Sequence, residues 1–221
     1  MSLFSKRTVC MAKIFSYLFL SIVVLGCSKD DSIHVDLSKF DTITERFPYT
    51  DLNPEVTFNY YELLYSIEGN ADEELITSEG TLCANASDAD ACAESFNAIE
   101  TMFGFAGGCL PSYCFLYIKL QEEGTNAILN TPEQLLTFLG TIDSASEAIL
   151  WANVNGYSHS SSSKETGAIQ KVDDHFELLV SELVSGCLPY QTDQVHLRID
   201  SDGKIIELGR AVYSYAKNSC I

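Results

Sequence analysis

Hydrophobic and polar residues alternate along much of the C-terminal part of the chain. Val195, Leu197 and Ile199 are separated by polar residues, which is the period of a strand with one buried face. Strand-like runs at 175–184 and 205–213 lie on either side of this segment. The sequence DSDGK joins the segment that contains Val195, Leu197 and Ile199 to the run at 205–213. Its composition is typical of a hairpin turn. The pattern therefore predicts an antiparallel sheet in this part of the chain.

Two helices are predicted by capping boxes, in which a hydroxyl residue and the residue three positions later satisfy the first backbone groups of a helix. Thr131 and Gln134 form the first box, and Ser144 and Glu147 form the second. A glycine near the end of each apolar run is a typical stop signal. Apolar residues follow each box at helical spacing, so both helices are expected to pack on a sheet.

The remaining pattern is less uniform. Residues 87–103 have apolar positions at helical spacing after Ser87, with Asp90 as a capping partner, and predict a helix that ends at a glycine. Residues 56–67 are compatible with strand or helix, and the spacing of their apolar residues favours a helix. Residues 114–129 read as a hairpin. The whole pattern predicts an α+β fold, with an antiparallel sheet of four to six strands and three to four helices.

The N-terminal residues have the composition of an export signal. Lys6, Arg7 and Lys13 precede an apolar run at 14–25, and no acidic residue occurs in residues 1–26. This run of 12 residues is shorter than the roughly 20 that a membrane-spanning helix requires. Residues 1–26 are therefore predicted to be a signal peptide, which begins at Met1 or at the internal start Met11.

The end of this segment has a recognisable order of residues. Val24, Leu25 and Gly26 precede Cys27, so an aliphatic and a small residue stand before the cysteine. This order resembles the lipobox of bacterial lipoproteins. The resemblance implies cleavage before Cys27 and acylation of its sulfur. The alternative is an ordinary export signal whose cleavage site lies near a cysteine.

The residues after the cysteine resemble a second signal, found in surface-exposed lipoproteins of Bacteroidota. Ser28, Lys29, Asp30 and Asp31 form a short polar and acidic cluster of that kind. The resemblance implies display on the outer face of the outer membrane. The same bacteria attach O-glycans at a hydroxyl residue that follows aspartate, and the triplets of this chain suggest Ser32, Thr42 and Ser144 as acceptors.

Residues 27–54 are polar and show no sustained period, so they are predicted to be a lipidated, flexible tether. Residues 55–221 are predicted to form a single α+β domain that this tether attaches to the membrane. The expected partners are the membrane, through the lipid, and an envelope protein or a glycan.

Cysteine usage agrees with export. Six cysteines follow the signal peptide and Cys27, and an even number in an exported chain indicates disulfides. Fifteen pairings are compatible with the sequence, and the local set is favoured. That set joins Cys83 to Cys92, Cys109 to Cys114, and Cys187 to Cys220. Zinc is the competing use of six cysteines, but no pair has the two-residue spacing of a zinc knuckle.

The net charge excludes one class of partner. The chain has 13 basic and 31 acidic residues, a formal charge of −18. Removal of residues 1–26 takes away three basic residues and leaves 10 minus 31, or −21. Nucleic acid is therefore an improbable partner, because binding it depends on neutralising phosphates with basic residues.

No sequence motif identifies an active site. His34, His159, His175 and His196 are the histidines of the chain, and no nucleophile elbow accompanies them. His196 is expected to face solvent, because it alternates with apolar residues of a strand. Asp173, Asp174 and His175 are adjacent on the chain and would point in different directions, so neither a metal nor another cofactor is predicted.

Two other groups of residues have a structural interpretation that is favoured over a functional one. The segment from Asp200 to Gly203 resembles part of a calcium loop but lacks its distal glutamate, so a turn is predicted. Five tyrosines would suit a sugar or peptide groove, but core packing is favoured for Tyr60, Tyr61, Tyr65, Tyr113 and Tyr117.

These observations favour a non-catalytic, surface-anchored lipoprotein. Its domain would be a binding or accessory module of an outer-membrane envelope complex. An exported hydrolase with an unidentified active site and a purely structural envelope protein are the alternatives.

Overall fold

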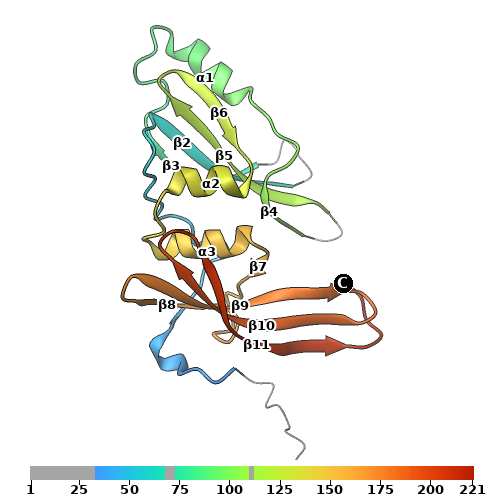
Figure 1. Ribbon diagram of the computed structural model, residues 1–221. Coiled ribbons are helices and arrows are strands. Elements are labelled where there is room, and N and C mark those ends of the chain that lie inside the picture. The colour runs from blue at the N-terminus through green and yellow to red at the C-terminus, as the bar shows by residue number, and fades with distance from the viewer. Residues whose placement is uncertain (1–32, 68–72, 110–111) are drawn as a thin grey trace, which may run out of the picture. The chain divides into compact units, whose positions relative to one another are not determined.

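The computed structural model describes residues 33–67, 73–109 and 112–221. Within these residues the predicted α+β class is confirmed, and the strands form two antiparallel sheets instead of one. Figure 1 shows the two sheets with two helices, α2 and α3, between them. One hydrophobic core contains residues from both sheets and from both of these helices.

The first sheet is built from the middle of the described chain. Its strand order is β3-β2-β5-β4, and β6 pairs with β5 beyond the end of β4. The strands are β2 (Tyr60–Ile67), β3 (Glu73–Gly80), β4 (Phe105–Gly108), β5 (Cys114–Glu122) and β6 (Thr125–Leu129). The predicted hairpin at 114–129 corresponds to β5 and β6 and is confirmed.

The second sheet combines both ends of the described chain. Its order is β1-β8-β9-β10-β11, and β7 pairs with β9. The strands are β1 (Asp41–Thr42), β7 (Tyr157–Ser158), β8 (Ala168–Val172), β9 (His175–Gly186), β10 (Tyr190–Asp200) and β11 (Ile205–Ala216). The three strand-like runs of the sequence are confirmed as β9, β10 and β11, which pair in sequence order.

The helices are η1 (Leu37–Lys39), α1 (Ala89–Asn97), α2 (Pro132–Leu139) and α3 (Ala145–Val154). Both capping boxes are confirmed, at the N-termini of α2 and α3. All residues from Ser146 to Ala152 are buried, so α3 is enclosed on every side, as expected of a helix without a polar face. None of the described helices has the length and hydropathy required to cross a membrane.

A hydrogen bond connects α3 to the second sheet. The indole nitrogen of Trp151 donates to the backbone oxygen of Gly203, at 2.7 Å, in the turn between β10 and β11. Gly203 has a φ of +81°, and a Cβ at this position would lie 2.7 Å from a methyl group of Leu136. The DSDGK turn is therefore confirmed, and its glycine is required both by conformation and by space.

The helix predicted for residues 56–67 is wrong. Residues 60–67 form the strand β2, which lies between β3 and β5. Tyr61, Leu63 and Tyr65 enter the main core, whereas Leu64 packs with residues of β5 on the opposite face. A strand buried on both faces has a nearly continuous apolar sequence, which its period cannot distinguish from a buried helix.

The helix predicted after Ser87 is shorter than expected. Asp88, not Ser87, is its N-cap and accepts a hydrogen bond from the backbone nitrogen of Ala91. The helix ends at Asn97 instead of near residue 103, and the side chain of Phe103 is 58% exposed. Phe96 is the fully buried residue of α1. A short helix is therefore sufficient to bury the one side chain by which α1 enters the core.

Residues 33–54 belong to the folded unit, although a flexible tether was predicted for 27–54. Phe40, Ile43, Tyr49 and Leu52 are buried, and β1 pairs with β8. The folded region therefore begins on the N-terminal side of the predicted boundary at residue 55. Isolated apolar residues without a period were sufficient for packing because the sheet supplies the regular surface.

Candidate functional site

Several of the predicted site residues lie outside the described residues. These are the lipidation residue Cys27, the export-signal residues Ser28, Lys29, Asp30 and Asp31, and the glycan acceptor Ser32. Their proposed roles therefore depend on the sequence.

The cysteine pairing expected from sequence is confirmed. Cys83 pairs with Cys92, Cys109 with Cys114, and Cys187 with Cys220. The first disulfide attaches α1 to the loop after β3, and the second closes the turn between β4 and β5. The third joins the end of β9 to the C-terminal segment after β11. All six cysteines of the domain are thereby used, which agrees with export to an oxidising compartment.

The two described glycan acceptors differ in accessibility. Thr42 is exposed in the short strand β1. Ser144 is buried, and its hydroxyl donates to the backbone oxygen of Asp51 while it caps α3. Ser144 therefore has a structural role that disfavours its modification in the folded protein, whereas Thr42 remains a proposed acceptor.

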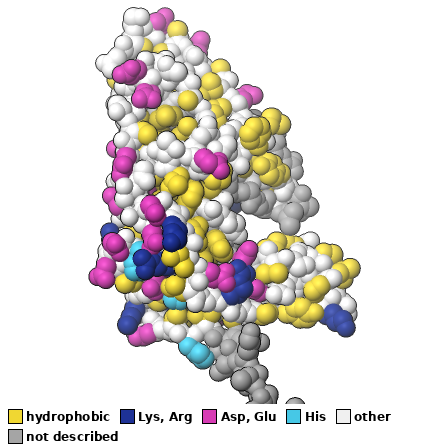
Figure 2. Space-filling view, in the orientation of Figure 1, with side chains coloured by type: hydrophobic (Ala, Val, Ile, Leu, Met, Phe, Trp, Pro, Cys, Tyr) yellow, Lys and Arg dark blue, Asp and Glu magenta, His cyan; other side chains and the backbone are white. Residues whose placement is uncertain are grey.

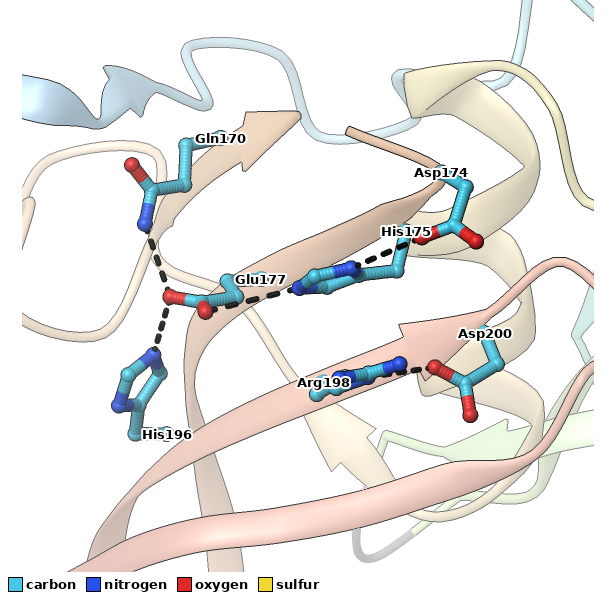
Figure 3. A network of polar contacts seen from close by, with 7 residues as sticks. All are labelled: Gln170, Asp174, His175, Glu177, His196, Arg198 and Asp200. Carbon is cyan, nitrogen blue, oxygen red and sulfur yellow. Dashed lines mark hydrogen bonds and ion pairs between the residues drawn. The ribbon is translucent and has the colours of Figure 1, made fainter. Parts of the chain in front are cut away.

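A polar network lies on the second sheet, on the face opposite the main core (Figure 3). Its centre is Glu177 of β9, whose carboxylate contacts the Nε2 atoms of His196 at 3.0 Å and of His175 at 3.7 Å. Gln170 of β8 donates a hydrogen bond of 2.8 Å to the same carboxylate. His175 also contacts Asp174 through Nδ1 at 3.4 Å. Three neighbouring strands thus contribute to one network.

The electrostatics of the network favour an ionised Glu177. Burial alone would raise the pKa of this carboxyl, but hydrogen bonds from Gln170 and His196 outweigh it and lower the pKa overall. On the same face, Arg198 of β10 donates a hydrogen bond of 2.5 Å to Asp200.

Phe40 of the N-terminal segment packs against this network. The Phe40 ring lies edge-on to the His196 ring, with 5.9 Å between their centres. The side chains of His175 and His196 are only 10% and 12% exposed. The prediction that His196 faces solvent is wrong, because residues that read as a tether pack over it. This arrangement holds a segment onto a sheet and does not present an open nucleophile or base to a substrate.

The remaining candidates from sequence have structural roles. Asp173 has a φ of +50° in the β8–β9 turn, and the predicted turn around Gly203 is confirmed. Within the described part of the chain, no group of three or more histidine, cysteine or acidic side chains is arranged to hold a metal ion. The side chains of Tyr61, Tyr65 and Tyr117 are buried, as core packing predicts.

A small apolar cavity lies between α2 and the β5–β6 hairpin. Its volume is about 260 Å³, and Leu120, Leu129 and Phe138 contribute to its lining. Glu122 and Glu133 also line it. The cavity is large enough for a small apolar ligand, but its polar groups are already engaged in the first turn of α2 or exposed to solvent.

The most distinctive surface of the described chain is the end of the β9–β11 ribbon, which extends beyond the core (Figure 1). We call residues 183–192 and 211–221 the ribbon tip. Large apolar side chains are exposed there, including Val212 at 52% and Tyr215 at 57%. This surface was not predicted from the sequence. Apolar and polar residues of β10 and β11 alternate without a change of pattern at the point where the strands leave the core. Exposed apolar surface of this kind favours contact with another surface.

Comparisons with family models, with curated proteins and with solved structures find no match for this chain. The functional argument therefore depends on the chain's own residues.

Proposed function

We propose that this protein is a lipoprotein, anchored to the outer membrane through Cys27 and displayed at the cell surface. Its domain acts without catalysis, as a binding or accessory module of an envelope complex. The observation that carries the proposal is the pairing of all six domain cysteines with one another. This pairing supports export and leaves Cys27, at the end of a lipobox-like sequence, for lipidation.

The polar network supports a non-catalytic role. His175 and His196 contact the same carboxylate and are nearly covered, so their polar groups stabilise the sheet. The exposed ribbon tip supports a role in contact with another surface. An acidic domain with these features is suited to recognition at a membrane and unsuited to binding nucleic acid.

The module function predicts a stable assembly in the native membrane. Cells that express the full chain would be treated with a short crosslinker, and the protein would be captured from detergent-solubilised membranes. We expect one envelope protein or glycan to be recovered in a fixed ratio to the protein. The same capture without crosslinker, and from cells that express an unrelated lipoprotein, provides the controls. Recovery of the lipoprotein with no stoichiometric companion would contradict the accessory-module proposal.

A further inference from the structure

The ribbon tip differs in composition from the rest of this acidic chain. The chain contains 31 aspartate and glutamate residues, yet neither 183–192 nor 211–221 contains one. Lys217 is the charged side chain of these two segments. Figure 2 shows hydrophobic and uncharged side chains over this projecting end, with a basic group at its extremity.

Apolar side chains are exposed on both faces of the tip. Residues paired across an antiparallel ladder point to the same face, and successive residues alternate. Tyr215 is paired with Gln191 of β10, on the face that continues from the core. Leu183 is paired with Thr192, and therefore lies on the other face. Leu183 is 45% exposed and Tyr215 is 57% exposed, so neither face is covered.

The acidic groups stop at the base of the tip. Arg210 of β11 lies within 2.6 Å of Glu182, 3.2 Å of Asp193 and 2.7 Å of Glu207. These contacts raise the pKa of the arginine, with the hydrogen bond to Glu207 the largest cause. Three carboxylates are thus held together by one guanidinium, immediately before the uncharged surface begins. Charge and apolar exposure therefore separate along the ribbon.

The N-terminal end of the described chain lies against the same strand. The side chain of Ile33 is next to Gly209 of β11, where an added Cβ would lie 3.8 Å from it. Six residue steps separate Ile33 from Cys27, and a fully extended chain of that length reaches about 20 Å. Along β11, the distance from Gly209 to Tyr215 is also about 20 Å, at the usual rise of a strand. A lipid on Cys27 would therefore hold the bilayer within reach of the tip.

We propose that the ribbon tip inserts into the interface of the lipid bilayer that holds Cys27. This inference rests on the proposed lipidation of Cys27. The lipid bilayer suits the tip because it can surround both apolar faces, whereas a protein surface would cover one. Tyrosines such as Tyr213 and Tyr215 are favoured at the level of the headgroups, and the stem of Lys217 can extend so that its ammonium stays in water. The lack of acidic side chains avoids repulsion from anionic lipids.

A second membrane contact changes how the domain is held. A lipid anchor fixes one end of the chain, but leaves the folded unit free to rotate about it. Insertion of the tip would add a second fixed point near Tyr215, about 20 Å along β11 from Gly209. The domain would then be restricted to a narrow range of orientations. The lipid anchor and the ribbon tip would then be two separate attachments to the membrane.

The test uses the mature, lipidated protein, reconstituted into phosphatidylcholine vesicles. Tyr215→Trp places a fluorescent residue at the tip, and Tyr113→Trp places one just before β5 of the first sheet, at a similar exposure of 47%. The natural Trp151 is buried and gives the same background in both variants. Vesicles with brominated acyl chains quench tryptophans that reach them. We expect Tyr215→Trp to lose emission in these vesicles and Tyr113→Trp to keep it.

A second pair of variants shows whether quenching depends on the apolar surface. Val212→Glu, in the Tyr215→Trp background, adds a carboxylate at an exposed position beside the reporter and should abolish quenching. Leu75→Glu changes a leucine of similar exposure, 53%, on β3 and should leave quenching intact. Because both sites are exposed, both variants are expected to fold, and far-ultraviolet circular dichroism checks this.

The outcomes separate this inference from the proposed lipoprotein. If Cys27 is acylated by mass spectrometry and the protein floats with the vesicles, but Tyr215→Trp is not quenched, the inserted tip is overturned and the lipoprotein stands. If Cys27 carries no acyl group, the Cys27 anchor is overturned, and the inserted tip, which rests on that anchor, is overturned with it. In the unquenched case, a photocrosslinker at position 215 that captured one protein on cells would assign the tip to a protein contact.

Discussion

At the scale of single residues, buried polar side chains connect segments that are distant in the sequence. Glu147 is fully buried and accepts hydrogen bonds from the backbone nitrogens of Asn53, Asp143 and Ser144, at 2.7, 2.9 and 3.0 Å. Burial raises the pKa of this carboxyl, and the three backbone hydrogen bonds oppose that effect. Glu147 was predicted as a capping partner for α3, but its bond to Asn53 was not predicted, because no local pattern reports a contact across that distance.

We expect Glu147→Ala to lower the free energy of unfolding by about 3 kcal/mol, because three backbone donors, one of them buried and two partly buried, lose their acceptor. Glu147→Gln keeps one acceptor oxygen and should lose less. Denaturant unfolding, with the disulfides intact, measures both. Glu133→Ala, at an exposed position in the first turn of α2, is the matched control and should change little. An unfolding curve of Glu147→Ala that matched the wild type would refute this role.

At the scale of elements, the second sheet holds the N-terminal segment in place. Val35, Leu37 and Phe40 pack on Ala168 and Leu179, beside the Glu177 network. The lowered pKa of Glu177 means that its ionised form stabilises the fold. This contribution is present above the ordinary pKa of 4.5 and is lost as the pH falls through the lowered value.

Glu177→Gln should therefore be less stable than the wild type near neutral pH, by about 1.5 to 3 kcal/mol, the usual value of hydrogen bonds to a charged group. The difference should shrink in acid, below the lowered pKa, where the wild-type carboxyl is also neutral. Thermal unfolding between pH 3 and 7, roughly the range around the reference pKa of a glutamate, measures this. Glu165→Gln, at an exposed loop position, should unfold in parallel with the wild type throughout. A stability loss that did not vary with pH would contradict the ionised role.

The sequence predicted elements well where local signals decide them. The capping boxes, the hairpin turn at Gly203 and the local disulfides were all found, since each depends on residues close in the chain. It failed for β2, where burial on both faces removes the strand period. It also missed the packing of Phe40 on His196 and the exposed ribbon tip, because both depend on where distant segments meet.

At the scale of the whole molecule, the steep acidity of the chain makes the anchor essential to the proposal. The charge of −21 that removal of residues 1–26 would leave, from 10 basic and 31 acidic residues, opposes any general attraction to an anionic membrane. A single acyl chain gives marginal membrane binding, whereas two or more hold a protein stably. In the proposed lipoprotein, the location of the domain therefore depends on the acylation of Cys27.

Cys27→Ala should abolish labelling by radioactive palmitate and leave the signal peptide uncleaved, because both reactions require the cysteine. Labelling on gels and the mass of the N-terminal peptide provide the measurements. Cys10→Ala is the matched control, since Cys10 lies within the predicted signal peptide and should be dispensable for labelling. A palmitate-labelled Cys27→Ala protein would show that the lipobox interpretation is wrong.

The pairing of β1 with β8 has a consequence for the order in which the protein is assembled. Asp41 pairs with Ile169, so β1 joins a sheet whose other strands all follow Gly156 in the sequence. The first sheet, in contrast, is complete in sequence by Leu129. As the chain emerges from its N-terminus, the first sheet has all of its strands while β1 still lacks its neighbour. The N-terminal segment that contains β1 can therefore pair with its neighbour only after β8 has been made.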